Sequence, residues 1–238
     1  PNNILGIEYI KALMRFNSKI NPVPLKRLGA GYHSLDTRTK LASATGIRTA
    51  MANKDNISGL LPDNCLNIIK NHTTIEYNDF STVLGSKLLS MDTLDHIEGI
   101  NQDLSNRIAN NKYNFTDIET FIPMLQSKNY TYSAISRALL HIILDIKTDD
   151  IKEFISNNYV NYAMILGFNK NTGILSEINK YTKIPLVSKF ATFYKEADNN
   201  QRKMLDINLK ADNLYRMIYM NKTSETLPTE FQRQIIIK

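Results

Sequence analysis

YSAISRALLHIILDI, residues 132–146, has the clearest periodic pattern in the chain. Its apolar residues recur three or four positions apart, at Tyr132, Ile135, Leu139, Ile142, Ile143 and Ile146. This spacing places them on one face of an α-helix. The opposite face has a polar stripe made of Ser133, Arg137, His141 and Asp145. We therefore expect an amphipathic helix that packs its apolar face into a core.

Helical spacing also runs through the preceding segments, over 80–91, 94–109 and 116–126. In the last of these, Thr116 and Glu119 have the spacing of a capping box, and Pro123 predicts a kink or an early end. Together with 132–146, these segments predict a helical bundle. After the bundle we expect a strand–helix–strand unit at 162–168, 174–181 and 184–187, then a helix over 200–219.

The first part of the chain has a different order of elements. We expect a helix over 4–16, a strand over 23–28, a turn at Gly29–Gly31, and helices over 42–52 and 62–71. A helix, strand and glycine turn in this order are typical of α/β nucleotide-binding folds. The predicted fold is thus mainly α with minor β, with a remnant of an α/β domain at 1–75 and a mainly helical region at 76–238.

Composition excludes several classes of protein. The 238 residues include 29 Lys and Arg against 23 Asp and Glu, a formal charge of +6. There is no apolar run long enough to span a membrane, and the lone Cys65 fits a reducing cytosol, so we expect a cytoplasmic protein. His33, His72, His96 and His141 lack metal-ligand spacing, and no nucleophile motif or P-loop is present, so no metal site and no catalytic residue are expected in this chain.

Three places could bind phosphate. Asn2 and Asn3 lie at a predicted helix start, where free N–H groups favour an anion, although a simple N-cap explains them as well. Arg27, with Leu28 beside it, lies at the end of the predicted strand, and α/β folds bind ligands at the carboxyl ends of their strands. A solvated surface position explains Arg27 as well. The third place is the start of the next predicted helix, where Ser43 and Thr45 are followed one turn later by Arg48, so that all three could contact the same anion. Capping alone also explains Ser43.

Several motifs in collinear order resemble one family, the bacterial tRNA(Met) cytidine acetate ligases. They are PNNILGIEY (1–9), RLGAGYH (27–33), SATGIR (43–48), DLSNRI (103–108), SKNYTY (127–132), RALLH (137–141) and LGFN (166–169). The motifs extend over essentially the whole chain, and the resemblance implies a nucleotidyltransferase-like fold. This chain departs from the family pattern at Asn129, where a basic residue is expected.

The resemblance implies an enzyme that activates acetate with ATP as acetyl-adenylate and acetylates the wobble cytidine of elongator tRNA(Met). It implies ATP contacts at Asn2 and Arg27, with Asn3, Leu28, Ser43, Thr45 and Arg48 as further candidates. Lys128, Arg137 and His141 are the candidates for tRNA contact, on a helical body expected to be basic. The resemblance leaves open whether Mg²⁺ accompanies the ATP.

The chain starts abruptly, with Pro1 in place of Met and a helix start directly after it. We expect that an N-terminal part with the family's His-x-Gly-His-type motif is missing, and that residues 1–238 alone are inactive. A non-catalytic helical module that binds RNA or a protein is the alternative function, and the polar stripe of 132–146 is then an ordinary solvated face.

Overall fold

The computed structural model describes residues 2–26, 34–35, 37, 41–170 and 173–238. The chain divides into two compact units, Pro1–His72 and Thr73–Lys238. The described residues are mainly helical with minor β content, as the sequence predicts. The roles predicted for 1–75 and 76–238 stay predictions.

Unit 1 contains the helices α1 (Asn2–Arg15), α2 (Ala44–Ala52) and α3 (Asp63–Asn71). All three lie where the sequence places them. The strand expected over 23–28 is absent from its described part, Val23–Lys26, which has no regular structure. Its remaining residues, like the Gly29–Gly31 turn, lie outside the described residues. A short β-permissive run becomes a strand only when it pairs with a neighbour, and no strand pairing is present in the described part of unit 1.

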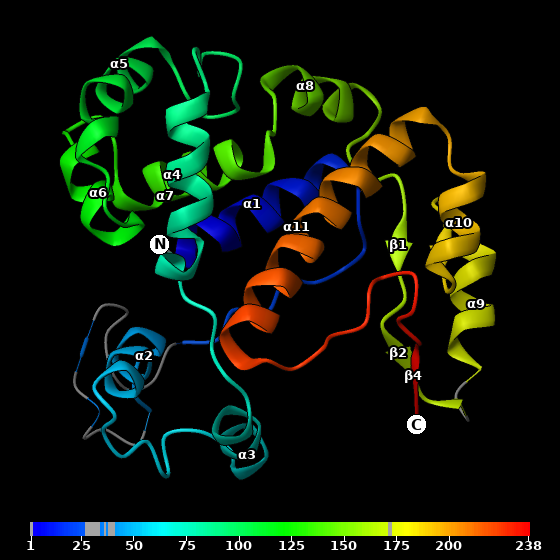
Figure 1. Ribbon diagram of the computed structural model, residues 1–238. Coiled ribbons are helices and arrows are strands. Elements are labelled where there is room, and N and C mark those ends of the chain that lie inside the picture. Colours follow the sequence, from blue (N-terminus) through cyan, green and yellow to red (C-terminus); the bar gives the residue numbers. More distant parts are fainter. Residues whose placement is uncertain (1, 27–33, 36, 38–40, 171–172) are drawn as a thin grey trace. The chain divides into compact units, whose positions relative to one another are not determined.

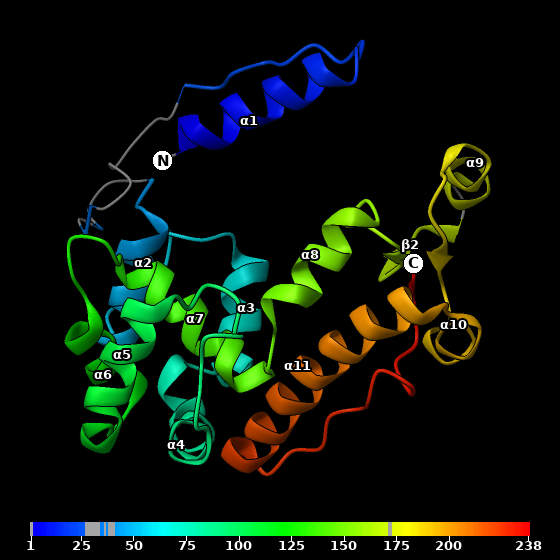
Figure 2. The same ribbon diagram turned by 90° about the horizontal axis from the view of Figure 1, so that it is seen from above.

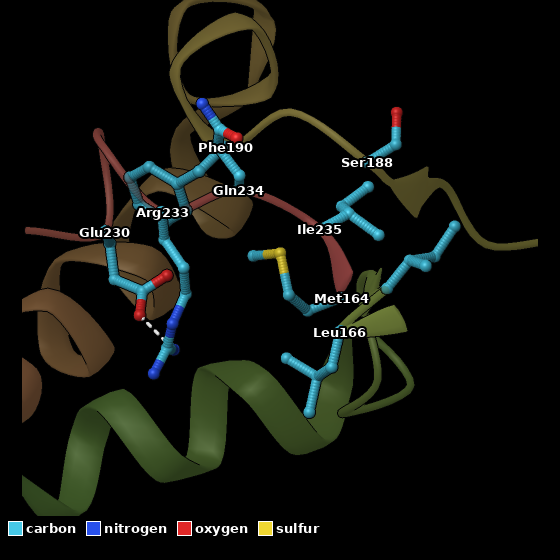
Figure 3. A pocket seen from close by; sticks show the side chains of 9 residues that line it. Met164, Leu166, Ser188, Phe190, Glu230, Arg233, Gln234 and Ile235 are labelled. Atoms are coloured by element: carbon cyan, nitrogen blue, oxygen red, sulfur yellow. Dashed lines mark hydrogen bonds and ion pairs between the residues drawn. The ribbon is translucent and has the colours of Figure 1, made fainter. Parts of the chain in front are cut away.

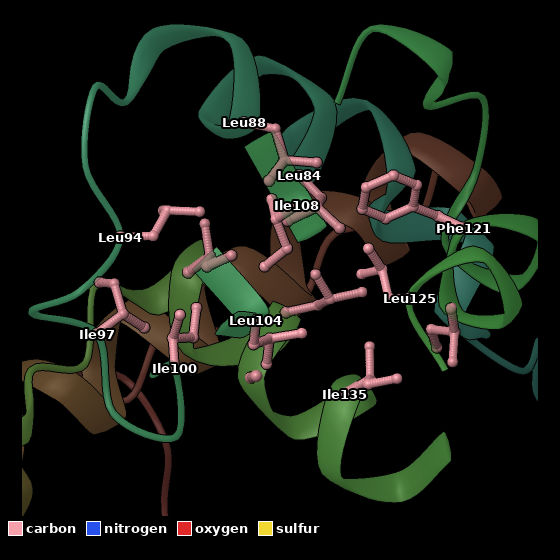
Figure 4. Packing of buried hydrophobic residues seen from close by; sticks show 14 of the residues in the cluster. Leu84, Leu88, Leu94, Ile97, Ile100, Leu104, Ile108, Phe121, Leu125 and Ile135 are labelled. Atoms are coloured by element: carbon pink, nitrogen blue, oxygen red, sulfur yellow. The ribbon is translucent and has the colours of Figure 1, made fainter. Parts of the chain in front are cut away.

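Unit 2 begins with a helical bundle, residues 73–159 (Figure 1). Its elements are η1 (Tyr77–Phe80), α4 (Ser81–Ser90), α5 (Gln102–Asn111), η2 (Lys112–Asn114), α6 (Ile118–Leu125), α7 (Tyr132–Leu144) and α8 (Thr148–Ser156). Side chains from α4, α5, α6 and α7 meet in one core, as Figure 4 shows. Leu139 of α7 is 1% exposed there, and Ile135, Ile142 and Ile143 are buried with it, which confirms the middle of the predicted apolar face. The ends differ from the prediction for 132–146: Tyr132 is 41% exposed, and α7 ends at Leu144, with Asp145 as its C-cap.

Two details of the bundle differ from the sequence expectations. α5 begins at Gln102 rather than near Leu94, because the Asn101 side chain accepts the Leu104 amide hydrogen at 3.0 Å and caps the helix there. α6 is capped by Asp117, which accepts from the Thr120 amide at 2.9 Å, so the expected Thr116–Glu119 capping box is wrong. Pro123 lies inside α6, two residues before its end.

The C-terminal region, residues 160–238, contains short parallel strands and three helices. β1 (Ala163–Met164) pairs with β3 (Leu186–Val187), and α9 (Ile174–Tyr181) lies between them in the chain, which confirms the predicted strand–helix–strand order. The run 162–168, however, forms two short strands with different partners rather than the one strand expected. β2 (Gly167–Phe168) pairs with the last strand, β4 (Ile236–Ile237). The remaining helices are α10 (Phe190–Glu196) and the long α11 (Asn199–Thr223).

α11 connects the two parts of unit 2. It contacts α7 and α8 of the bundle, and its Lys222 pairs with Asp79 of η1 at 2.7 Å. In both views, α9 and α10 lie at the strand end of unit 2, whereas α5 and α6 lie at its opposite end (Figures 1 and 2). The C-terminal region therefore presents a surface well separated from the far end of the bundle.

Candidate nucleotide and RNA contacts

The start of α2 is the best-defined of the predicted phosphate contacts. Ser43 is 1% exposed, and its Oγ accepts from the Gly46 amide at 2.9 Å while donating to the Ser34 carbonyl at 2.5 Å. Both hydrogen bonds are internal, so Ser43 caps α2 and ties it to the preceding segment. A Cβ on Gly46 would lie 3.1 Å from the same Ser34 carbonyl oxygen, so glycine allows this close approach.

Thr45 and Arg48 follow on α2 and are exposed. Thr45 lies in the first turn, where unpaired amide N–H groups and the helix dipole favour an anion. Arg48 has no ion pair among the described residues. The structure therefore leaves Thr45 and Arg48 available to a ligand, whereas the hydroxyl of Ser43 is already occupied.

α1 starts at Asn2, so Asn2 and Asn3 both lie in its first turn. Asn3 is exposed, while the side chain of Asn2 and all of Arg27 and Leu28 lie outside the described residues. The rest of α1 exposes apolar side chains, and a hollow of about 510 Å³ beside it is lined by Ile10, Leu13, Met14, Asn17, Ser18, Ile20 and Pro22. Unit 1 thus exposes an apolar helix in addition to its polar helix starts.

The three candidates for tRNA contact have different surroundings. Lys128 precedes α7, whereas Arg137 and His141 lie on it. Lys128 and Arg137 are exposed, and neither has an ion pair within the described part of the chain. His141 has its Nδ1 2.7 Å from the Glu98 carbonyl oxygen. Since a carbonyl can only accept, Nδ1–H is the donor, and His141 joins α7 to the segment before α5. The roles of these three residues in RNA contact stay predictions.

Charge is distributed unevenly along unit 2. Residues 76–238 contain 19 Lys and Arg and 19 Asp and Glu, so the expected basic helical body is wrong for this region as a whole. The bundle has 7 basic and 12 acidic residues, a net charge of −5, whereas the C-terminal region has 12 basic and 7 acidic residues, a net charge of +5. Counting charge by segment, rather than over the whole chain, would have found this difference in the sequence.

Half of the basic residues in the C-terminal region have internal partners. Lys203 pairs with Asp150 and Glu153, Lys222 pairs with Asp79, and Arg233 pairs with Glu230. Lys210 donates to the Leu144 carbonyl and Arg216 to the Leu227 carbonyl. The sixth, Arg202, lies 4.4 Å from the ring centroid of Tyr194 and donates to its carbonyl.

The other six basic residues of this region, here called the C-terminal lysines, are exposed and have no partner in the described structure: Lys170, Lys180, Lys183, Lys189, Lys195 and Lys238. None of them was singled out from the sequence. Their ammonium groups are free to contact an external anion.

A small cavity lies where β1 and β3 end (Figure 3). It has a volume of about 30 Å³, and its lining includes Met164, Ser188 and Phe190. That is room for about one water molecule. Arg233 and Glu230 form an ion pair on its wall, so each already balances the other's charge.

The described residues contain neither a candidate metal site nor a candidate membrane span. No group of three or more His, Cys, Asp or Glu side chains there could hold a metal ion. None of the described helices is both long enough and apolar enough to cross a membrane.

Comparison with known proteins places the chain in a family. Residues 1–230 match the family described as HIGH Nucleotidyl Transferase. A protein of Thermoanaerobacter sp. (strain X514) named tRNA(Met) cytidine acetate ligase is 32% identical over 93% of this chain and 56% of its own length. One with the same name from Caldanaerobacter subterraneus subsp. tengcongensis is 35% identical over 92% of this chain and 56% of its own.

A solved structure has the same fold. It is Thermotoga maritima TmcAL bound with alpha-thio ATP, which matches with a TM-score of 0.85 and 24% identity over 99% of this chain and 59% of that one. The chain therefore spans less than two thirds of the length of these relatives.

Proposed function

Because this chain belongs to the HIGH nucleotidyltransferase family, and within it to the tRNA(Met) cytidine acetate ligases, we propose that it is part of an enzyme that makes N4-acetylcytidine in elongator tRNA(Met). The observation that supports this most is the family match over residues 1–230. The proposed substrates are ATP, acetate and the tRNA, and the proposed location is the cytoplasm.

The proposed reaction has two steps. A carboxylate oxygen of acetate attacks the α-phosphorus of ATP, which forms acetyl-adenylate and releases pyrophosphate. The N4 amine of the cytidine then attacks the acetyl carbonyl carbon, loses a proton and releases AMP. Both steps depend on positioning the reactants and on stabilising negative charge at phosphate.

Unit 1 supplies the proposed ATP contacts. Asn2 and Arg27 are proposed to bind ATP, with Asn3, Leu28, Thr45 and Arg48 beside it. An exposed arginine can form paired hydrogen bonds to phosphate oxygens, and a helix start offers amide hydrogens. The structure supports Thr45 and Arg48 in this role because both are exposed near the start of α2. Ser43 is proposed to act indirectly, by holding α2 in place.

Arginine substitutions test the proposed ATP contacts. They are made in a protein that contains this sequence and has the full length of the relatives. Arg27→Ala should lower the yield of N4-acetylcytidine by about 10- to 100-fold, because it removes a charge-assisted hydrogen bond of about 1.5–3 kcal/mol. Arg48→Ala should have a smaller effect. Arg15→Ala, at the exposed end of α1, is the matched control and should leave the yield unchanged.

Unchanged activity in Arg27→Ala would remove that residue from the site. A protein of that length that binds tRNA but makes no N4-acetylcytidine when given ATP and acetate would instead favour the alternative, a non-catalytic RNA-binding module.

A further inference from the structure

Resting on the proposed function, we propose that the C-terminal lysines and Tyr181 form the main tRNA-binding surface of unit 2. The lysines contact phosphates, and the Tyr181 ring stacks on an unpaired base. This surface lies on the strand end of unit 2, around α9 and α10 (Figures 1 and 2).

The first argument is the availability of charge. Binding to a phosphate backbone gains free energy from the counterions that lysine and arginine displace, so cations already neutralised by carboxylates contribute little. On α11, Lys203 and Lys222 are paired with carboxylates. Its other three basic residues, Arg202, Lys210 and Arg216, keep their charge, but their side chains are held by carbonyl or ring partners. The C-terminal lysines have none among the described residues, which makes them the largest set of free cations in the C-terminal region.

The second argument is placement. Lys170 and Lys238 are brought together because β2 and β4 are parallel: the Lys170 amide donates to the Lys238 carbonyl at 2.9 Å. Lys189 lies two residues after the end of β3 and is the N-cap residue of α10. Lys180 lies at the end of α9, and Lys183 follows two residues after it. The short strands thus bring together lysines from distant parts of the sequence.

The third argument is Tyr181, which lies between Lys180 and Lys183. Its side chain is 81% exposed, and no residue of α9 is buried. An exposed aromatic ring flanked by free cations is typical of surfaces that bind single-stranded nucleic acid, where bases stack on rings and lysines follow the backbone.

The bundle supports the same assignment by its opposite charge. Its net charge of −5 repels a polyanion, whereas the +5 of the C-terminal region attracts one. The tRNA should therefore approach unit 2 from the strand end and away from α5 and α6.

The test measures binding of elongator tRNA(Met) to the full chain by filter binding over a range of NaCl concentrations. The triple variant Lys180→Gln, Lys183→Gln, Lys189→Gln should bind about tenfold more weakly or worse, and its log–log salt slope should fall by about 2. Tyr181→Ala should bind about fivefold more weakly, while Tyr181→Phe, which keeps the ring, should bind like the unchanged chain.

The control is Lys87→Gln, Lys112→Gln, Lys152→Gln, which removes three positive charges from the bundle and should change affinity and slope little. Lys152 pairs with Asp149 and Lys112 lies over the Tyr113 ring, so this variant controls for the loss of three charges and not for the loss of three unpartnered ones. Circular dichroism should show that both triple variants fold. Equal effects of the two triple variants, or no effect of the first, would overturn this inference and leave the acetate ligase proposal intact.

Two other results also discriminate. If polyglutamate binds as tightly as tRNA and Tyr181→Ala has no effect, the surface belongs to an acidic protein and the inference is overturned. If the unchanged chain shows no salt-dependent tRNA binding, the inference is overturned too. The proposed function is then decided separately, by whether the full-length protein makes N4-acetylcytidine.

Discussion

The bundle and the C-terminal region of unit 2 differ in which side chains they bury and which they expose. The bundle contains the whole of the main apolar core, sixteen buried residues from Leu84 to Ile143. The C-terminal region buries few large side chains, among them Val187, Phe190 and Leu205, and exposes six lysines that have no partner among the residues that the structure describes. This difference suggests that the bundle supplies stability, while the C-terminal region supplies a charged surface held in shape by short strands and α11.

The largest effect should come from the core of the bundle. Leu139→Ala removes a side chain that is 1% exposed, and should lower the free energy of unfolding by about 2–5 kcal/mol because it leaves a cavity. Leu166→Ala, in the C-terminal region, removes one that is 66% exposed and should change it by less than about 0.5 kcal/mol. Urea denaturation measures both; equal losses would contradict the contrast between the two regions.

A smaller effect is expected at the cap of α5. The Asn101 side chain accepts hydrogen bonds from the Leu104 amide at 3.0 Å and from the Tyr130 hydroxyl at 2.6 Å. Asn101→Ala should destabilise the chain by about 1–2 kcal/mol, since it leaves both donors without this acceptor. Asn101→Asp keeps an acceptor oxygen and should recover most of the loss in thermal melting. If Asn101→Ala melts like the unchanged chain, the cap does not stabilise the bundle.

The ion pair between Asp79 and Lys222 connects the bundle to α11 and should stabilise the chain by about 0.5–1 kcal/mol at neutral pH. Burial raises the pKa of Asp79, but the Glu76 amide and Lys222 outweigh it, so the pKa of this carboxyl is lowered. A lowered pKa in the folded state means that the stabilisation is present above about pH 4 and is lost as the pH falls through the folded value.

The loss of stability in Lys222→Met should therefore be full at neutral pH and shrink on acidification. Urea denaturation over a pH series measures it. A loss that stays constant down to acid pH would show that Lys222 stabilises the chain by packing and not by its charge.

The smallest effect on stability should come from the C-terminal lysines. The variant Lys180→Gln, Lys183→Gln, Lys189→Gln changes three exposed side chains without partners among the described residues. Its unfolding free energy should stay within about 0.5 kcal/mol of the unchanged chain. A larger loss in urea denaturation would mean that these lysines stabilise the fold, and the contrast between the two regions would weaken.

Sequence patterns predicted most helices because their signals are local. The spacing of Leu139 and Ile142 and the Thr131 cap define α7 within one stretch of chain. Strand pairing is a long-range property: the β-branched run Ile235–Ile237 favours a strand locally, but only the fold shows that it pairs with β2, almost seventy residues earlier. α8 and α10 were missed because helices of nine and seven residues give only a short periodic pattern.

The candidate site was predictable in part. The sequence left two interpretations of Ser43 open, a phosphate contact and a cap, and the structure confirms the cap, since Ser at a helix start is a local signal. The free state of the C-terminal lysines could not be predicted, because it depends on which basic residues of α11 meet acids such as Asp150 and Asp79 across the fold. The expectation of a basic helical body failed because the whole-chain charge of +6 hides a bundle of charge −5.

Ultraviolet crosslinking of elongator tRNA(Met) to the full chain, with the attached peptides identified by mass spectrometry, tests the central claim most directly. In unit 2, the account predicts crosslinked peptides from the C-terminal region, with Tyr181 among the attached residues. Crosslinks confined to the bundle, around Lys128 and Arg137, would contradict it and would place the tRNA on α7 instead.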